Sequence, residues 1–277
     1  MEIILAKNAG FCFGVENAID TTIESLENKK NVYSLGPLIH NDQVVEYLET
    51  KGLKVIDSPL DLENKNLIIR SHGVPLSVYD VSESRGNNVI DCTCPFVRNL
   101  QKKTKSCYEK GNNIIIIGDK NHPEIIGING WCENKANIVN SIEDVHRLKP
   151  MDSACVVVQT TMIEEKFERI VTELKKYIKD LKVFNTICQA TKERQNSCEE
   201  VSKLVDAMIV IGGKKSSNTK KLAEISRENC KNVFHIEEAD EIDIDNIKKF
   251  NKIGITAGAS TPDWIINEVI GRLEKSN

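Results

Sequence analysis

The sequence predicts an α/β fold built on parallel β-sheets. Short runs of Val, Ile and Leu recur from one end of the chain to the other, and near-continuous apolar runs are typical of parallel strands buried on both faces. The segments between the runs are long enough for crossover helices; residues 164–178, for example, carry apolar side chains at helical spacing. The six clearest strand runs are residues 3–5, 67–69, 114–117, 156–158, 208–211 and 253–255.

A weak internal repeat divides the chain into three parts. Three times an extended segment leads through a short loop to a cysteine and then to a helical pattern, and these cysteines are Cys12, Cys94 and Cys188. The intervals of 82 and 94 residues match the size of a small α/β unit. We therefore expect three similar lobes, over residues 14–96, over 97–190, and over 191–277 together with 1–13. In the third lobe the first strand is expected to pair with the carboxy-terminal third of the chain.

Composition and charge limit the possible partners. The 277 residues are 40% hydrophobic and 28% charged, which is the balance of a soluble globular enzyme. The formal net charge of -4 provides no basic field for a nucleic acid or an anionic membrane. The amino terminus lacks the pattern of a secretory signal, and no apolar stretch approaches the roughly 20 residues of a membrane span. We expect a cytoplasmic protein that binds neither nucleic acid nor membrane.

The nine cysteines are many for an intracellular chain, and the reducing cytosol argues against disulfide bonds. Cys12, Cys94 and Cys188 each stand at the start of a predicted helix, where free N–H groups and the helix dipole stabilise a thiolate. Three such thiolates suit a 4Fe-4S cluster in which one iron stays open for chemistry. From spacing alone, burial in the core is an equally good interpretation. The other six are expected to be structural: Cys92, Cys107, Cys132, Cys155, Cys198 and Cys230.

Polar loops follow four of the predicted strands, at the edge of a parallel sheet where ligands usually bind. The loops cover residues 70–73, 118–124, 212–219 and 257–262. The last two combine glycines with hydroxyl and amide groups ahead of a helix, which suits a bound phosphate. Helix capping by the same residue types is the alternative interpretation.

Three of the five histidines fall in loops at predicted strand ends, namely His40, His72 and His122. Together they can donate to a diphosphate as imidazolium or transfer protons near neutral pH. Glu124 follows His122 and is a candidate general acid if a poorly solvated site raises its pKa. The alternatives are a solvated histidine and a surface carboxylate. The basic run of Lys214, Lys215, Lys220 and Lys221 is expected at most to steer an anionic substrate.

Eight short motifs, taken in order, resemble the family of 4-hydroxy-3-methylbut-2-enyl diphosphate reductases, which catalyse the last step of the methylerythritol phosphate route to isoprenoids. The resemblance runs from end to end, and the ordered set is much more specific than any single motif. The motifs are GFCFGV at 10–15, SHG at 71–73, DCTCP at 91–95, HPE at 122–124, QTT at 159–161, TIC at 186–188, GKKSSNT at 213–219 and TAGAS at 256–260.

The resemblance implies a pseudo-threefold trefoil of three α/β lobes around a central 4Fe-4S cluster. The cluster ligands would be Cys12, Cys94 and Cys188, with the hydroxyl of the allylic diphosphate on the fourth iron. Thr160 would orient this hydroxyl, Glu124 would supply protons, and His122 would take part in catalysis as well as binding. The diphosphate ligands implied are His40, His72, His122, Ser216, Ser217, Asn218 and Ser260.

The implied reaction removes the hydroxyl with two electrons and two protons, giving isopentenyl and dimethylallyl diphosphates and water. Electrons would come from a ferredoxin or a flavodoxin, and the family suggests a monomer. Two other functions remain open from the residues alone. One is a zinc-dependent phosphate-ester hydrolase, although zinc ligands are usually spaced more closely. The other is a non-enzymatic iron-sulfur redox sensor, which would not need the diphosphate loops.

Overall fold

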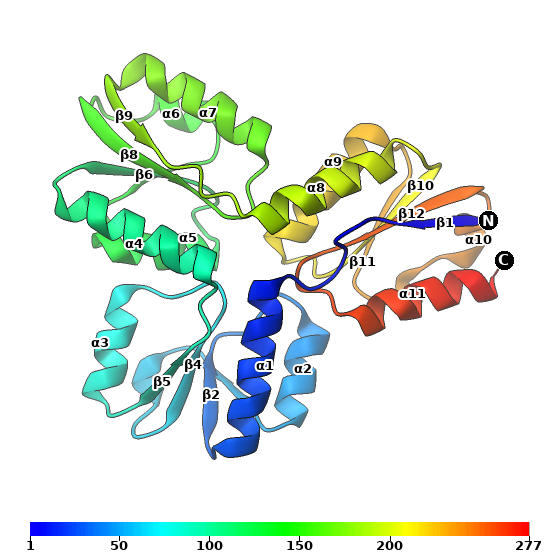
Figure 1. The fold of residues 1–277 in the computed structure, drawn as a ribbon, viewed down its shortest axis with the longest axis horizontal. Coiled ribbons are helices and arrows are strands. Elements are labelled where there is room, and N and C mark those ends of the chain that lie inside the picture. The colour runs from blue at the N-terminus through cyan, green and yellow to red at the C-terminus, as the bar shows by residue number, and fades with distance from the viewer. Residues whose placement is uncertain (277) are drawn as a thin grey trace. The chain divides into compact units, whose positions relative to one another are not determined.

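The computed structural model describes residues 1–276, which form three four-stranded parallel sheets with helices packed on them (Figure 1). The predicted α/β class is therefore confirmed. The chain separates into two compact units, each described here by itself. Unit 1 comprises Met1–Glu16, Ile39–Glu46 and the chain from Gln189 onward, and unit 2 comprises Asn17–Leu38 and Tyr47–Cys188.

The three sheets have the same topology. In unit 2 the first sheet contains β2 (Val32–Leu35), β3 (Lys54–Ile56), β4 (Asn66–Ile69) and β5 (Asn88–Asp91), in the order β3-β2-β4-β5. The second contains β6 (Asn113–Ile117), β7 (Asn137–Val139), β8 (Ser153–Val158) and β9 (Asp180–Val183), in the order β7-β6-β8-β9. The third, in unit 1, contains β1 (Glu2–Leu5), β10 (Ala207–Ile211), β11 (Val233–Ile236) and β12 (Lys252–Ala257), in the order β11-β10-β12-β1.

Each sheet therefore follows the order second, first, third, fourth strand, provided that β1 counts as the fourth strand of the third sheet. Parallel pairing of β1 with β12 is continuous from Glu2 opposite Lys252 to Leu5 opposite Ile255. The predicted pairing of the first strand with the carboxy-terminal third is thus confirmed. The exact lobe boundaries given above stay a prediction.

Eleven α-helices within residues 1–276 connect and cover these strands. They are α1 (Phe13–Asn28), α2 (Asp42–Thr50), α3 (Leu76–Ser84), α4 (Pro95–Glu109), α5 (Pro123–Asn129), α6 (Ile142–His146), α7 (Glu164–Tyr177), α8 (Gln189–Ser202), α9 (Ser217–Asn229), α10 (Ile244–Ile247) and α11 (Asp263–Lys275). The helix predicted at 164–178 is α7, one residue shorter because Ile178 is already extended. No helix in this part of the chain combines the length and the apolar composition needed to cross a bilayer.

The second sheet shows why these sequences form buried parallel strands. Alternate residues of β6 belong to two different cores: Ile115 and Ile117 pack toward α6 and α7, and Ile114 and Ile116 pack toward α4 and α5. Figure 1 shows these two helix pairs on opposite faces of the sheet. Because both faces are covered, a run of four isoleucines is favourable where an exposed sheet would require alternation with polar residues.

Replacing Ile116 by alanine is expected to lower the free energy of unfolding by about 2–5 kcal/mol, because the fully buried side chain leaves a cavity against α4 and α5. Chemical denaturation followed by circular dichroism measures this loss. The control is Leu60→Ala, since Leu60 is 61% exposed, and its effect should stay within about 0.5 kcal/mol. Equal effects of the two changes would contradict the assignment of the β6 core.

Candidate functional site

The predicted site residues lie at the carboxyl ends of the parallel strands. His40, His122 and Ser216 are each the fifth residue after the first strand of a sheet, which is β2, β6 or β10. His72, Thr160 and Ser260 follow the third strands, β4, β8 and β12. The three cysteines follow the fourth strands, β5, β9 and β1. The shared topology of the sheets thus places chemically similar loops at equivalent positions.

The backbone at each predicted cluster ligand is held by the same kind of hydrogen bond. The N–H of Cys94 donates to the carbonyl of Ser71 at 3.0 Å, and that of Cys188 to Thr160 at 2.9 Å. In unit 1 the N–H of Cys12 donates to the carbonyl of Ala259 at 3.3 Å. Each acceptor is the second residue after the third strand of its own sheet. The three cysteines are therefore equivalent in the local fold, which the spacing along the sequence only suggested.

All three cysteines stand directly before or at the start of a helix, as predicted. Cys94 is the N-cap of α4, with Pro95 in the first helical turn, and Cys188 immediately precedes α8. The carbonyl of Cys12 accepts from the N–H groups of Val15 and Glu16 at 2.9 and 3.0 Å, which closes the first turn of α1. Each sulfur is thus carried at the positive end of a helix dipole, where an anionic ligand set is stabilised.

Solvent exposure separates these three thiols from the others. All nine cysteines are unbridged; Cys12, Cys94 and Cys188 are partly exposed, and the remaining six are buried. Burial raises the pKa of Cys92 to about 11, opposed by a hydrogen bond with Thr22, so this thiol stays neutral at physiological pH. Burial likewise raises the pKa of Cys198. The prediction that the other six cysteines are buried in the structure is confirmed.

In unit 2, the Glu124 carboxyl group is held by Thr160. Oε1 of Glu124 accepts from the N–H of Thr160 at 2.7 Å, and Oε2 accepts from its hydroxyl at 2.6 Å. Glu124 is only 2% exposed, and it is supplied by the first turn of α5. The carbonyl of the same Thr160 receives the N–H of Cys188. Thr160 therefore links the carboxyl group of Glu124 to the backbone of Cys188, a candidate metal ligand.

The two histidines of unit 2 lie beside this group. His122 is the N-cap of α5, and its Nδ1 accepts from the N–H of Glu124 at 3.1 Å. In the neutral ring the proton therefore resides on Nε2, which makes this atom a donor. The rings of His72 and His122 meet edge to face, with centroids 5.5 Å apart. Unit 2 thus brings together His72, His122, Glu124, Thr160 and the backbone of Cys188.

The loop before α9, which is the predicted anion cradle, lies in unit 1. Ser216 is the N-cap of α9, and its hydroxyl accepts from the N–H of Thr219 at 3.3 Å, so the capping interpretation is correct for this residue. Asn218 is 5% exposed, and neither amide atom has a hydrogen-bonding partner among the described residues. A buried amide without a partner is costly. An anionic ligand at the start of α9 would accept a hydrogen bond from the side-chain N–H of Asn218.

Glycines let the surrounding loops approach this cradle. A Cβ at Gly258 would lie 2.1 Å from Oγ1 of Thr219, and one at Gly213 would lie 2.4 Å from the carbonyl oxygen of His40. The hydroxyl of Ser260 donates to the same carbonyl at 3.2 Å. Unit 1 thus brings His40, Ser260 and the 213–219 loop together, and Cys12 is tied to Ala259 beside them.

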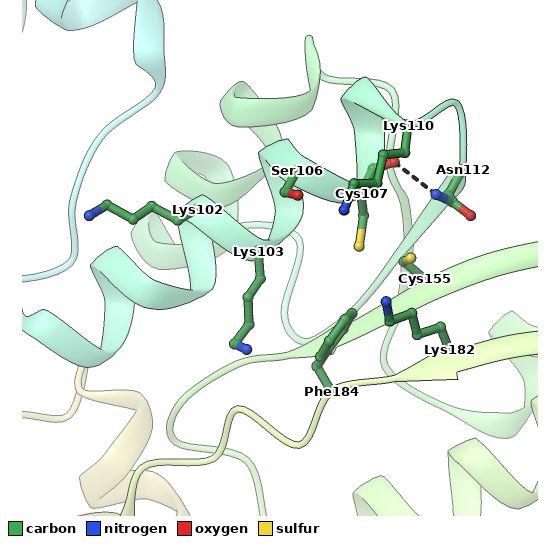
Figure 2. Close-up of a pocket in the computed structure, with 9 residues that line it drawn as sticks. All are labelled: Lys102, Lys103, Ser106, Cys107, Lys110, Asn112, Cys155, Lys182 and Phe184. Carbon is green, nitrogen blue, oxygen red and sulfur yellow. Dashed lines mark hydrogen bonds between the residues drawn. The ribbon is translucent and has the colours of Figure 1, made fainter.

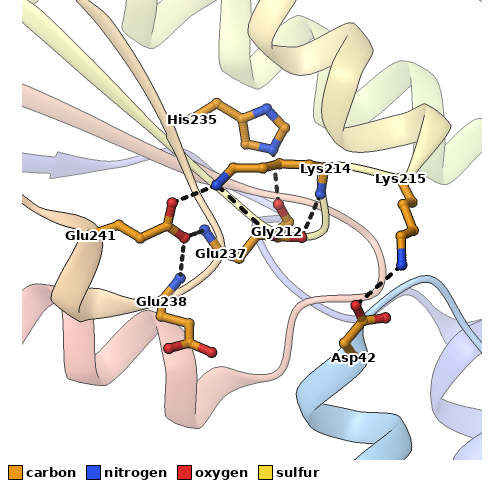
Figure 3. Close-up of polar contacts among 8 residues, drawn as sticks. All are labelled: Asp42, Gly212, Lys214, Lys215, His235, Glu237, Glu238 and Glu241. Atoms are coloured by element: carbon orange, nitrogen blue, oxygen red, sulfur yellow. Dashed lines mark hydrogen bonds and ion pairs between the residues drawn. The ribbon is translucent and has the colours of Figure 1, made fainter.

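The lysines that open this loop are neutralised by acidic neighbours. The ammonium group of Lys214 lies 2.5 Å from Glu241 and 3.8 Å from Glu237. Lys215 pairs with Asp42 at 3.4 Å. Figure 3 shows both lysines held by these carboxylates, with His235 bonded to the carbonyl of Gly212 at 2.8 Å. The pairing weakens any steering of an anion by Lys214 and Lys215.

Arg194 is a residue of the site region that the sequence interpretation missed. It is 3% exposed in α8, and its guanidinium donates to the carbonyl of Gly10 at 2.9 Å, two residues before Cys12. The same guanidinium donates to the carbonyl of Ala190 at 3.2 Å. A signal was present, because position 194 falls on the apolar helix face formed by Ala190, Cys198 and Val201. A charged residue on such a face indicates a buried partner.

The chain matches the family model described as LytB protein over residues 3–274. The chain belongs to the LytB family. Among the relatives of this LytB chain, a protein of Caldanaerobacter subterraneus subsp. tengcongensis is 52% identical and one of Clostridioides difficile is 47% identical. Each alignment covers 99% of this chain, with 97% of the first relative and 99% of the second. Both relatives are named 4-hydroxy-3-methylbut-2-enyl diphosphate reductase.

The solved structures similar to this LytB chain include two diphosphate reductases. One solved structure is that of an (E)-4-hydroxy-3-methyl-but-2-enyl diphosphate reductase, described as the terminal enzyme of the non-mevalonate pathway. Its sequence is 40% identical to this chain, and the TM-score is 0.73. The match covers 99% of this chain and 100% of that one. The solved structure of the reductase from Plasmodium falciparum is 30% identical in sequence, with a TM-score of 0.93. This match covers 98% of the present chain and 87% of the Plasmodium chain. The predicted family is confirmed, and this LytB chain is an enzyme of the oxidoreductase class.

Proposed function

We propose that this LytB chain reductively removes the hydroxyl group of 4-hydroxy-3-methylbut-2-enyl diphosphate, giving isopentenyl and dimethylallyl diphosphates. The observation that carries the proposal is the set of three partly exposed thiols at equivalent positions of three sheets, each at the start of a helix. The names of relatives that align over nearly the whole chain support the same reaction.

The residues present fit a 4Fe-4S cluster. Cys12, Cys94 and Cys188 are the cysteines with exposed surface, and thiolates at helix starts are the ligands that such a cluster prefers. Three ligands from the chain would leave one iron for the substrate. When bound, the cluster would pass electrons from the external donor to the substrate and would act as a Lewis acid for the hydroxyl group.

The diphosphate is assigned to the donors identified in the two units. Asn218, Ser217, Ser216 and Ser260 offer amide and hydroxyl groups beside the start of α9, and His40 adjoins them through its backbone. His122 offers Nε2–H, and His72 packs against its ring. Neutral donors that the backbone holds in place bind an anion without first having to reorganise.

Glu124 and Thr160 are assigned to the proton and the hydroxyl. The reaction breaks the allylic C–O bond, adds two electrons, places one proton on the departing hydroxyl to form water and places the other on carbon. A buried carboxyl group bonded to a threonine hydroxyl is suited to pass the first proton. Thr160 is also suited to orient the hydroxyl that leaves, because both its N–H and its hydroxyl are fixed by Glu124.

A ferredoxin or flavodoxin is the proposed electron donor, and the enzyme is proposed to act as a monomer in the cytoplasm. The nine unbridged cysteines support a reducing compartment. The absence of a dinucleotide fingerprint favours an external protein donor over a bound nicotinamide.

Anaerobically purified protein should be brown and contain about four irons and four sulfides per chain. With a reduced viologen dye as electron source, it should consume the allylic diphosphate and release both isomeric products in stoichiometric amounts. Iron and sulfide analysis, together with product chromatography, tests both parts. A colourless zinc protein that cleaves phosphate esters would contradict the proposal. A brown protein without turnover would instead favour the redox sensor.

A further inference from the structure

A basic pocket in unit 2 contains none of the residues assigned to the proposed reaction. It has a volume of about 280 Å³ and is open to solvent (Figure 2). We call it the α4–β9 pocket, after the two elements that carry most of its lysines. The residues that line it are Lys102, Lys103, Ser106, Cys107, Lys110, Asn112, Cys155, Lys182 and Phe184.

The charge of this pocket is unbalanced. Four of its nine lining residues are lysines, and none is a carboxylate. None of these four ammonium groups pairs with a carboxylate within residues 1–276, whereas Lys105 on the same helix pairs with Glu109 and Lys214 is held by two glutamates. On a chain with a formal net charge of -4, this is a local concentration of positive charge. Such a patch attracts an anionic surface.

An aromatic ring lies between two of these lysines. The ammonium group of Lys103 lies 4.9 Å from the centroid of Phe184, and that of Lys182 lies 5.3 Å from it. Figure 2 shows both lysines beside this ring, and the nearby Cys107 and Cys155 are buried. An aromatic side chain flanked by charges of one sign suits the docking of a partner of opposite charge.

The pocket is built from the two segments of unit 2 that carry proposed cluster ligands. Lys102 and Lys103 lie on α4, whose N-cap is Cys94, and Lys103 is about 14 Å along the helix axis from it. Phe184 directly follows β9 and precedes Cys188 by four residues. A partner seated here therefore contacts the chain close to two of the three proposed ligands.

We propose that the α4–β9 pocket is the docking surface for the electron donor, a small acidic protein that carries one electron at a time. The proposal rests on the proposed function. Two successive docking events, each oxidising one reduced carrier by one electron, supply the two electrons that the C–O cleavage requires. Charge complementarity selects a protein with an acidic surface around its redox centre.

The test is the double variant Lys103→Glu/Lys182→Glu, assayed with two electron sources. With a reduced, net-negative bacterial ferredoxin or flavodoxin at low salt, kcat/KM for the carrier should fall at least about tenfold, mostly through KM. The loss should shrink as ionic strength rises. With reduced methyl viologen, turnover and iron content should equal those of the unchanged enzyme, because neither lysine belongs to the reaction site.

The control is Lys248→Glu/Lys249→Glu, the same change of charge at two exposed lysines near the end of α10. It should leave carrier-driven kcat/KM within about twofold of the unchanged enzyme. Equal carrier kinetics in the pocket variant and the control would overturn the docking proposal, and this is also the result expected if the pocket merely binds a small anion. Failure of the unchanged enzyme with viologen would instead refute the proposed function.

Discussion

Replacing Cys188 by serine should remove most of the bound iron and lower turnover by about a thousandfold or more, because the proposed cluster would lose a thiolate ligand. The serine keeps the backbone N–H that donates to Thr160, so the loop between β9 and α8 should stay in place. Iron and sulfide analysis, visible absorption and viologen-driven turnover measure the effect. Circular dichroism of the variant should match that of the unchanged chain.

The matched control is Cys230→Ser. Cys230 is buried, and its sulfur faces the backbone carbonyls of Asp206 and Asn232 at 3.5 Å, where a serine hydroxyl can donate instead. This variant should keep its full iron content and colour. If Cys188→Ser retained as much iron as Cys230→Ser, the assignment of Cys188 as a ligand would be wrong.

Replacing Glu124 by glutamine should lower kcat by about 10²–10⁴-fold while the iron content and colour stay unchanged, because proton transfer is lost and the shape of the side chain is kept. The glutamine carbonyl can still accept from the N–H of Thr160, and its amide can donate to the Thr160 hydroxyl. Single-turnover measurements with a pre-reduced enzyme separate this chemical defect from electron delivery.

Two comparison variants make the result specific. Glu165→Gln makes the same change at an exposed position in the first turn of α7 and should turn over normally. Thr160→Ser keeps the hydroxyl that bonds to Glu124 and should retain most activity, whereas Thr160→Val should not. Near-normal turnover of Glu124→Gln would rule out the carboxyl group as the proton source.

The strands that the sequence predicted are mainly those with long aliphatic runs at the centre of a sheet. β6, β8, β10 and β12 are buried on both faces, so their composition is almost entirely apolar. The short strands β3, β7 and β11 were missed, because each lies at the edge of its sheet, where exposed or half-buried positions allow Lys54, Asn137 or His235. β2 was also missed, since its four residues include Tyr33 and Ser34.

The candidate site was predictable to the extent that its residues stand in polar loops after predicted strands. His122 and Glu124 were found in this way, but the acceptor role of Nδ1 and the bonds to Thr160 depend on tertiary structure. Nor can spacing distinguish an exposed thiol from a buried one: Cys92 and Cys94 are two residues apart in the same loop, and only the second is partly exposed. Such differences arise from packing between segments distant in the sequence.

The place of β1 in the third sheet affects when a newly made chain could hold the proposed cluster. Cys12 is synthesised long before Ala259, yet its loop is anchored to Ala259, and its strand pairs with residues 252–255. Unit 2, with Cys94 and Cys188, draws only on residues 17–188 and can fold much earlier. An unfinished chain therefore presents two ordered thiols at most. Stable loading of iron should wait until residues 252–259 have been synthesised, so products that terminate before them would leave the ribosome without a cofactor.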